Sequence, residues 1–71
     1  MLLADFIKNV RKQLEMSQEQ LAKALNVSFS TINRWENGKA VPSNLAQKIF
    51  FDFCEGNLIK VPSELREKKF N

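Results

Sequence analysis

Apolar residues recur at intervals of three and four along much of this chain, the spacing that places them on one face of an α-helix. The first such stretch predicts a helix near residues 2–14. Its apolar stripe is formed by Leu3, Phe6, Ile7, Val10 and Leu14. Shorter stripes follow it, so the pattern predicts an all-α fold, a compact bundle of about five short helices.

The C-terminal part of the chain predicts two of these helices. One follows Ser43 and stops near Gly56. Its apolar stripe is formed by Leu45, Ala46, Ile49, Phe50 and Phe53. The last helix is predicted near residues 62–69, where a proline suits the first turn. Residues 57–61 are apolar for a loop, and part of them could pair as a short extended piece.

Residues 17–38 predict two short helices joined by a tight polar turn. Ser17 is a good N-cap, and Gln20 stands three residues later, as a capping box requires. Asn26 tolerates the left-handed conformation that ends a helix sharply, and Val27 would hold the turn against the core. This is the pattern of a helix-turn-helix, whose second helix enters the major groove of DNA.

The second helix of this pair is capped by Ser28 and ended by Gly38. At about 100° per residue, its outward positions fall within an arc of roughly 140°. These positions are Phe29, Ser30, Asn33, Arg34 and Asn37. Ile32 and Trp35 lie on the opposite side and are expected in the core. A hydroxyl, amides and a guanidinium are groups that recognise base edges, whereas a merely solvated face would more often carry Glu and Lys.

The segment resembles the lambda-repressor-like family of DNA-binding domains, also called Xre or Cro/C1-type regulators. The resemblance rests on SQEQLA at 17–22, NVS at 26–28, STINRWENGK at 30–39 and the Pro-Ser pair at 42–43. It implies a five-helix domain that binds operator DNA as a dimer. It also implies an ion pair between Arg11 and Glu36, which would link the first and third helices.

The resemblance further implies DNA-contacting roles for individual side chains. The implied base contacts are Phe29, Ser30, Asn33 and Arg34. The implied backbone contacts are Gln18, Ser28, Thr31, Asn37, Lys39 and Ser43. Phe29 departs from the family pattern, in which a polar residue is more usual. Three roles are open for its ring: contact with a thymine methyl, packing on the preceding helix, or contact with a protein.

Composition fits one small DNA-binding domain over residues 1–71, with a net charge of +3. Cys54 is the single cysteine, so no internal disulfide can form, and we expect a reducing compartment. Apolar runs are too short to span a membrane, and the early Asp5 and Lys8 are unlike a signal peptide. A cytoplasmic location in a prokaryote or phage system is therefore expected.

The sequence gives little support for a catalytic or a metal-binding function. The chain has no His, so neither histidine base chemistry nor the usual zinc ligand sets are available. Only two glycines are present, and they form no phosphate-binding loop. No catalytic residue, cofactor site or metal site is predicted, and the protein is not expected to be an enzyme.

The sequence thus predicts a sequence-specific binder of double-stranded DNA that acts as a small transcriptional regulator, such as a repressor. It would act as a homodimer on its operator. The dimer contact is predicted at the apolar group after the fourth helix: Leu58, Ile59, Val61 and Phe70. The alternative is a module that binds a protein partner, either as an antitoxin or as an adaptor for a DNA-modifying enzyme such as a methyltransferase. In that case Phe29 and the same apolar group would face protein.

Overall fold

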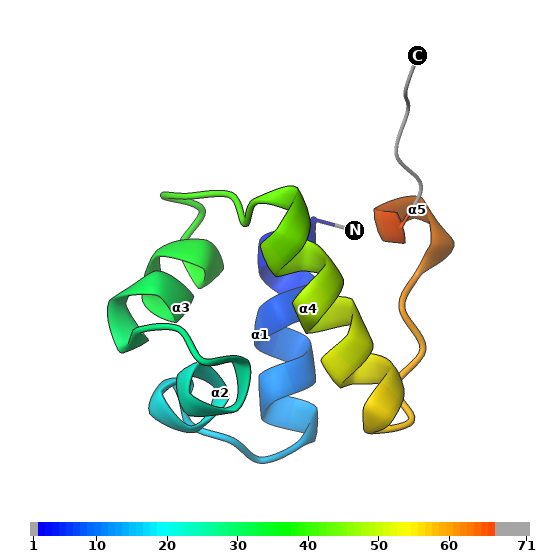
Figure 1. Cartoon of the computed structure of the whole chain (residues 1–71), viewed down its shortest axis with the longest axis horizontal. Coiled ribbons are helices and arrows are strands. Elements are labelled where there is room, and N and C mark those ends of the chain that lie inside the picture. Colours follow the sequence, from blue (N-terminus) through cyan, green and yellow to red (C-terminus); the bar gives the residue numbers. More distant parts are fainter. Residues whose placement is uncertain (1, 67–71) are drawn as a thin grey trace.

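A computed structural model describes residues 2–66, and all regular structure in this range is helical (Figure 1). The helices are α1 (Leu3–Gln13), α2 (Gln18–Leu25), α3 (Phe29–Glu36), α4 (Asn44–Gly56) and α5 (Ser63–Arg66). The all-α prediction is confirmed, and the short extended pairing after α4 does not form. Residues 67–69 of the predicted last helix, and Phe70, lie outside the described residues. None of the five helices combines the length and the apolar character needed to cross a bilayer.

Serine side chains cap three of the helices, as the sequence predicts. Ser17 accepts a bond from the Gln20 backbone N–H at 3.0 Å, and the Gln20 side chain accepts one from the Ser17 N–H at 2.7 Å. Ser28 and Ser43 cap α3 and α4 in the same way, each through the N–H three residues later. Each cap satisfies a backbone donor that the helix itself leaves unpaired and typically stabilises by about 1 kcal/mol.

Left-handed residues end α1 to α4, where the chain turns back and satisfies the last carbonyls. The residues are Glu15, Asn26, Gly38 and Leu58, with φ of 58°, 60°, 72° and 61°. Asn26 and Gly38 were predicted from their residue types. At the end of α4 the left-handed position is not Gly56, which is still helical, but Leu58, after which the Ile59 N–H bonds the Cys54 carbonyl at 2.8 Å.

The core lies where α1, α2, α3 and α4 meet. Its fully buried members include Ile7, Leu21, Ile32, Phe50 and Cys54. Phe6 of α1 meets Phe50 of α4 edge to face, with ring centroids 5.9 Å apart. Because α1 and α4 lie side by side at the centre of the bundle (Figure 1), this aromatic contact joins the two longest helices.

The apolar stripe predicted for α4 is partly wrong. Leu45 and Ile49 are 68 % and 44 % exposed, whereas Gln47, Phe51 and Cys54 are buried beside Phe50. Apolar residues flank Phe50 on both sides of the helix, so spacing alone could not choose the inward face. Gln47 can be buried because its Nε2 donates to the Pro42 carbonyl at 2.9 Å.

The segment after α4 folds back on the bundle. Ile59 and Val61 are 8 % and 6 % exposed and belong to the core, so the predicted dimer contact at these two residues is wrong. Leu58 is 95 % exposed. Arg66 of α5 lies over the ring of Phe51 at 5.5 Å and pairs with Glu55, which ties α5 to α4. Ile59 and Val61 thus complete the core of the domain.

Candidate nucleic-acid interface

Helix α3 is held against α1 and α2 by its inner face and presents a polar outer face. Ile32, Trp35 and Glu36 are buried, which confirms the predicted core positions of the first two. The exposed or partly exposed outer positions are Phe29, Ser30, Thr31, Asn33, Arg34 and Asn37. An eight-residue helix with one face anchored and one face polar is what a groove-reading element requires.

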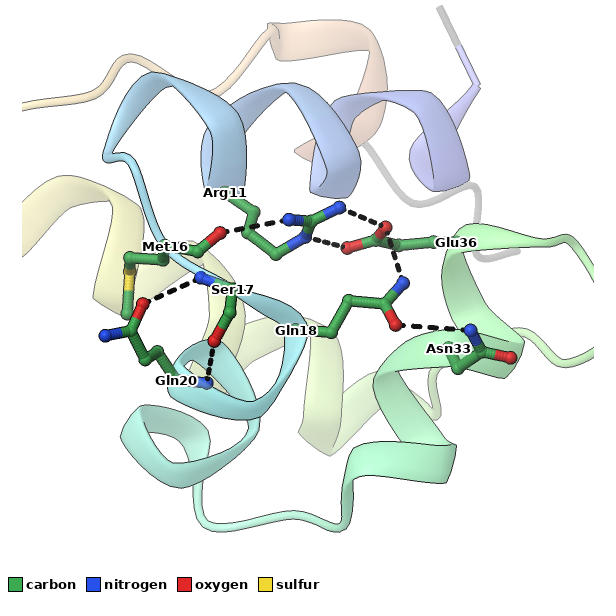
Figure 2. A network of polar contacts seen from close by, with 7 residues as sticks. All are labelled: Arg11, Met16, Ser17, Gln18, Gln20, Asn33 and Glu36. Atoms are coloured by element: carbon green, nitrogen blue, oxygen red, sulfur yellow. Dashed lines mark hydrogen bonds and ion pairs between the residues drawn. The ribbon is translucent and has the colours of Figure 1, made fainter.

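A chain of polar side chains joins α1, α2 and α3 (Figure 2). Arg11 donates to both carboxylate oxygens of Glu36, with Nε to Oε2 at 2.7 Å and Nη2 to Oε1 at 2.9 Å. Gln18 Nε2 donates to the same Oε1 at 3.0 Å, and Gln18 Oε1 accepts from Asn33 Nδ2 at 3.2 Å. Asn33 Oδ1 then accepts from Asn37 Nδ2 at 3.1 Å. Five of the residues implied by the resemblance therefore form one connected network.

Glu36 is the buried charge in this network, with 1 % of its side chain exposed against 15 % for Arg11. Burial by itself would raise the pKa of Glu36, because it removes water from the charged form. The hydrogen bonds from Arg11 and Gln18, followed by the charges of Arg11 and Lys8, outweigh burial and hold this pKa below its usual range. The hydrogen bond to Glu36 likewise raises the pKa of Arg11.

Two contributors to this network were missed by the sequence analysis. The Met16 carbonyl accepts a third bond from Arg11, through Nη1 at 3.0 Å, and so fixes the guanidinium plane. Lys8 lies close enough to Glu36 to lower its pKa. A backbone carbonyl leaves no signature in the residue type, but the position of Lys8 three residues before Arg11 places both on one face of α1.

Three hydroxyl groups gather at the N-terminus of α3. Ser28 Oγ lies 2.8 Å from Thr31 Oγ1 and 3.2 Å from Ser30 Oγ, and it accepts a bond from the Thr31 N–H at 3.1 Å. Hydroxyls at a helix start stand beside backbone N–H groups and the positive end of the helix dipole. Together they can donate hydrogen bonds to phosphate oxygens.

At the C-terminal end of α3, a backbone hydrogen bond joins two cationic residues, Arg34 and Lys39. The Arg34 carbonyl accepts from the Lys39 N–H at 2.9 Å, and the Gly38 N–H bonds the Trp35 carbonyl at 3.2 Å. Both cationic side chains belong to exposed residues. Ser43 is exposed at the start of α4, on the far side of the loop that begins here. Within residues 2–66, no side-chain hydrogen bond or ion pair joins Arg34, Lys39 or Ser43 to the amide network, so these residues form a separate part of the candidate interface.

Phe29 is 49 % exposed and stands apart from the other outer residues of α3. Its ring lines an open hollow of about 690 Å³ whose walls come mainly from α2 and the turn. The lining residues include Lys23, Asn26 and Val27. About half of the ring is therefore available for a contact with another molecule.

The arrangement of α2 and α3 agrees with the protein family that the chain matches. Residues 7–48 match the helix-turn-helix family. The chain is also 42 % identical, over 52 residues, to the Type II methyltransferase M1.ScrFI of Lactococcus lactis subsp. cremoris. That match covers 69 % of this chain but only 13 % of the methyltransferase. No solved structure matches the chain significantly. Because the family match spans more than half of the chain and contains α2, the turn and α3 whole, the chain belongs to the helix-turn-helix family of DNA-binding domains.

Proposed function

We propose that this protein binds double-stranded DNA at specific sequences as a small transcriptional regulator, with α3 in the major groove. The observation that carries the proposal is the division of α3 into a buried face at Ile32 and Trp35 and an outer face of polar groups. On that outer face, Arg34 suits the two acceptors of a guanine, and Asn33 suits the acceptor and donor of an adenine. Ser30 contributes a hydroxyl that can bond either kind of base.

Phosphate contacts would set the position of the domain on the duplex. We assign them to Gln18, Ser28, Thr31, Asn37, Lys39 and Ser43. Support comes from the placement of these residues at the starts of α2, α3 and α4 and around the end of α3. Backbone N–H groups at helix starts and a flanking lysine are groups that bind phosphate without reading sequence.

The ring of Phe29 would complete the base contacts. Phe cannot make a directional hydrogen bond to a base, but an apolar ring can touch the methyl group of thymine. Its half-exposed ring, beside an open hollow, supports a contact at the edge of the recognised site, where apolar surface now covered by water would be buried.

Two copies would bind one operator. A single α3 touches only a few base pairs, and a two-fold dimer on half-sites about 10 base pairs apart would supply a useful specificity. The contact between copies must be sought outside Ile59 and Val61, because both are in the core. Since the target is DNA, we expect the protein in the cytoplasm of a prokaryote or of a phage-infected cell.

The proposal is tested by selecting bound duplexes from a random pool and then measuring affinity against salt. One enriched motif is expected, ideally as two symmetric halves, and affinity should fall with a log–log slope of about −0.9 for each phosphate neutralised. Exposed Lys23, Arg34 and Lys39 are the cations in and beside the motif. A pool that yields no motif, or affinity that does not change with salt, would contradict the proposal.

A second candidate is a DNA-reading module that works beside a larger enzyme. It is favoured by the match of 52 residues to part of a type II methyltransferase. In this case α3 keeps its role, and a partner protein occupies exposed apolar surface such as that at Phe29. Light scattering after gel filtration, with one operator duplex added, separates the two. Two chains per duplex indicate a homodimeric regulator, whereas one chain per duplex indicates a module that needs a partner.

A further inference from the structure

Glu36 imposes a direction on the amide side chains that follow it in the network (Figure 2). A carboxylate can only accept hydrogen bonds. Its Oε1 already accepts from Arg11 Nη2 at 2.9 Å and from Gln18 Nε2 at 3.0 Å. Gln18 must therefore point its NH₂ group at Glu36, because the reverse orientation would set two acceptor oxygens against each other. The amide oxygen of Gln18 then has to face away from the carboxylate.

The orientation of the Gln18 amide in turn sets the orientation of Asn33 on the outer face of α3. Gln18 Oε1 can only accept, so Asn33 turns its Nδ2 toward it, at 3.2 Å. Asn33 Oδ1 then accepts from Asn37 Nδ2 at 3.1 Å. Reversing the amide of Gln18 or of Asn33 breaks the bonds on both sides of it. The orientation of Asn33 is thus coupled, through two hydrogen bonds, to a buried charge on the inner side of its own helix.

The orientation of Asn33 matters because the network uses only part of its bonding capacity. An amide has two N–H donors and two lone pairs on oxygen, and the network occupies one of each. The remaining N–H donor and oxygen acceptor of Asn33 match the N7 acceptor and N6 donor of adenine when the two amide groups lie in one order across the groove. Exchanging the oxygen and nitrogen of Asn33 reverses this order. The reversed amide then matches adenine in a T·A pair, or the N4 donor and O6 acceptor of a C·G pair.

We propose that Glu36 is a positioning residue for base recognition, and that its charge fixes the base pair preferred by Asn33 by holding the Gln18 and Asn33 amides in one orientation. This inference rests on the proposed function, in which Asn33 contacts a base edge. The ion pair with Arg11 holds Glu36 charged and in place. The bond from Glu36 to Gln18 carries the orientation to α3. Glu36 itself need not touch DNA.

The decisive comparison is between Arg11→Met and the double variant Arg11→Met with Glu36→Gln. Both lack the ion pair, so both bear the same loss of the Arg11 contacts. They differ in the charge at position 36 and in whether its side chain only accepts hydrogen bonds or can also donate them. The double variant has no unpaired buried charge, which protects its folding. Without Arg11, burial raises the pKa of Glu36, so affinities are measured over a range of pH values and compared where the preference of Arg11→Met no longer changes as the pH rises. The duplexes are the selected operator and variants carrying each base pair at the position read by Asn33.

Wild type and Arg11→Met are expected to share the same base preference at that position, roughly 5- to 150-fold for a bidentate contact. The double variant should lose most of this preference, with T·A or C·G gaining relative to A·T, while preferences at the other positions persist. A merely structural role of Glu36 would weaken binding to all sequences alike. An unchanged preference in the folded double variant would overturn the inference.

Failure of the inference and failure of the proposed function are distinguishable. If Asn33→Ala leaves the base preferences of the wild type unchanged, Asn33 reads no base and the functional assignment itself is wrong. If Asn33→Ala abolishes one preference that the double variant keeps, only the role of Glu36 is wrong. Should the double variant not fold, Gln18→Leu replaces it. This variant keeps the Arg11–Glu36 pair but breaks the relay, so the same preference should fall.

A measurement without DNA tests the orientation itself. In a nitrogen-15 spectrum, the Gln18 side-chain amide should show one proton shifted downfield by its bond to the carboxylate. At a pH where Glu36 is ionised, Arg11→Met should retain this shift, and the double variant should lose it, together with a change at the Asn33 amide. Retention of both signals at their wild-type positions in the double variant would show that Glu36 does not set the amide orientation.

Discussion

Arg11 and Glu36 lie 25 residues apart in the chain and meet through two hydrogen bonds, from Nε at 2.7 Å and from Nη2 at 2.9 Å. The pair holds α1 against α3. The carboxylate is almost fully buried, and no side-chain polar atom buried within residues 2–66 lacks a hydrogen-bond partner. Such a pair fixes geometry more than it stabilises, because desolvation offsets much of its attraction.

Removing one partner should therefore cost more than removing both. Arg11→Met alone is expected to lower the free energy of unfolding by up to about 3–5 kcal/mol, because Glu36 is left charged and unpaired. Arg11→Met combined with Glu36→Leu should cost less. Urea unfolding of the wild type, Arg11→Met, Glu36→Leu and the double variant measures the coupling free energy between the two residues. Strictly additive losses would show that the two residues act independently.

Acid should destabilise the protein through Glu36. Its pKa is lowered in the folded state, so at pH values below about 4.3 the unfolded chain takes up a proton that the folded protein does not. The stabilisation is complete above that range and is lost as the pH falls through the folded-state pKa. Thermal unfolding followed from pH 7 downward should show this loss. A variant with Glu36→Gln should lack this component of the pH dependence, and an identical profile would rule out Glu36 as its source.

Neighbouring cations at the end of α3 should behave differently on DNA. Arg34→Ala is expected to cost about 1–3 kcal/mol on the selected site and to relax specificity there, because a guanine loses its bidentate partner. Lys39→Ala should weaken binding to all sequences evenly and reduce the salt slope by about 1. Titrations of specific and random duplexes at several salt concentrations separate the two effects. Equal losses on both duplexes for Arg34→Ala would mean that another face of the domain reads DNA.

The two glycines should respond oppositely to the same substitution. Gly38 has φ of 72°, which an alanine adopts only with strain, so Gly38→Ala should destabilise by about 1–2 kcal/mol. Gly56 lies within α4, and a Cβ there would meet nothing within 4 Å. Gly56→Ala should therefore stabilise by about 0.4–1 kcal/mol, since it restricts the unfolded chain. Thermal melts of both variants provide the measurement, and shifts in the same direction would contradict the assignment of the left-handed turn to Gly38.

Local chemistry in the sequence determined the helix starts and the turn of the helix-turn-helix. Ser17, Ser28 and Ser43 are residues that cap helices wherever they precede one, and Asn26 and Gly38 tolerate the left-handed backbone. These preferences act within three or four residues, so they can be recognised without knowing the rest of the fold. The inward face of α3 followed in the same way, because its apolar residues other than Phe29 lie on one side.

Tertiary structure decided whatever depended on distant partners. Apolar residues occur on several sides of α4, and only packing against α1, α2 and α5 turned Phe51 and Cys54 inward and left Leu45 and Ile49 exposed. The sequence alone left Ile59 and Val61 free for a partner, but the left-handed turn at Leu58 directs the chain back and buries both residues in the core. The bond between Gln18 and Asn33 likewise joins two helices. Spacing along a chain reports which side chains share a face, but burial and hydrogen bonding depend on what that face meets in space.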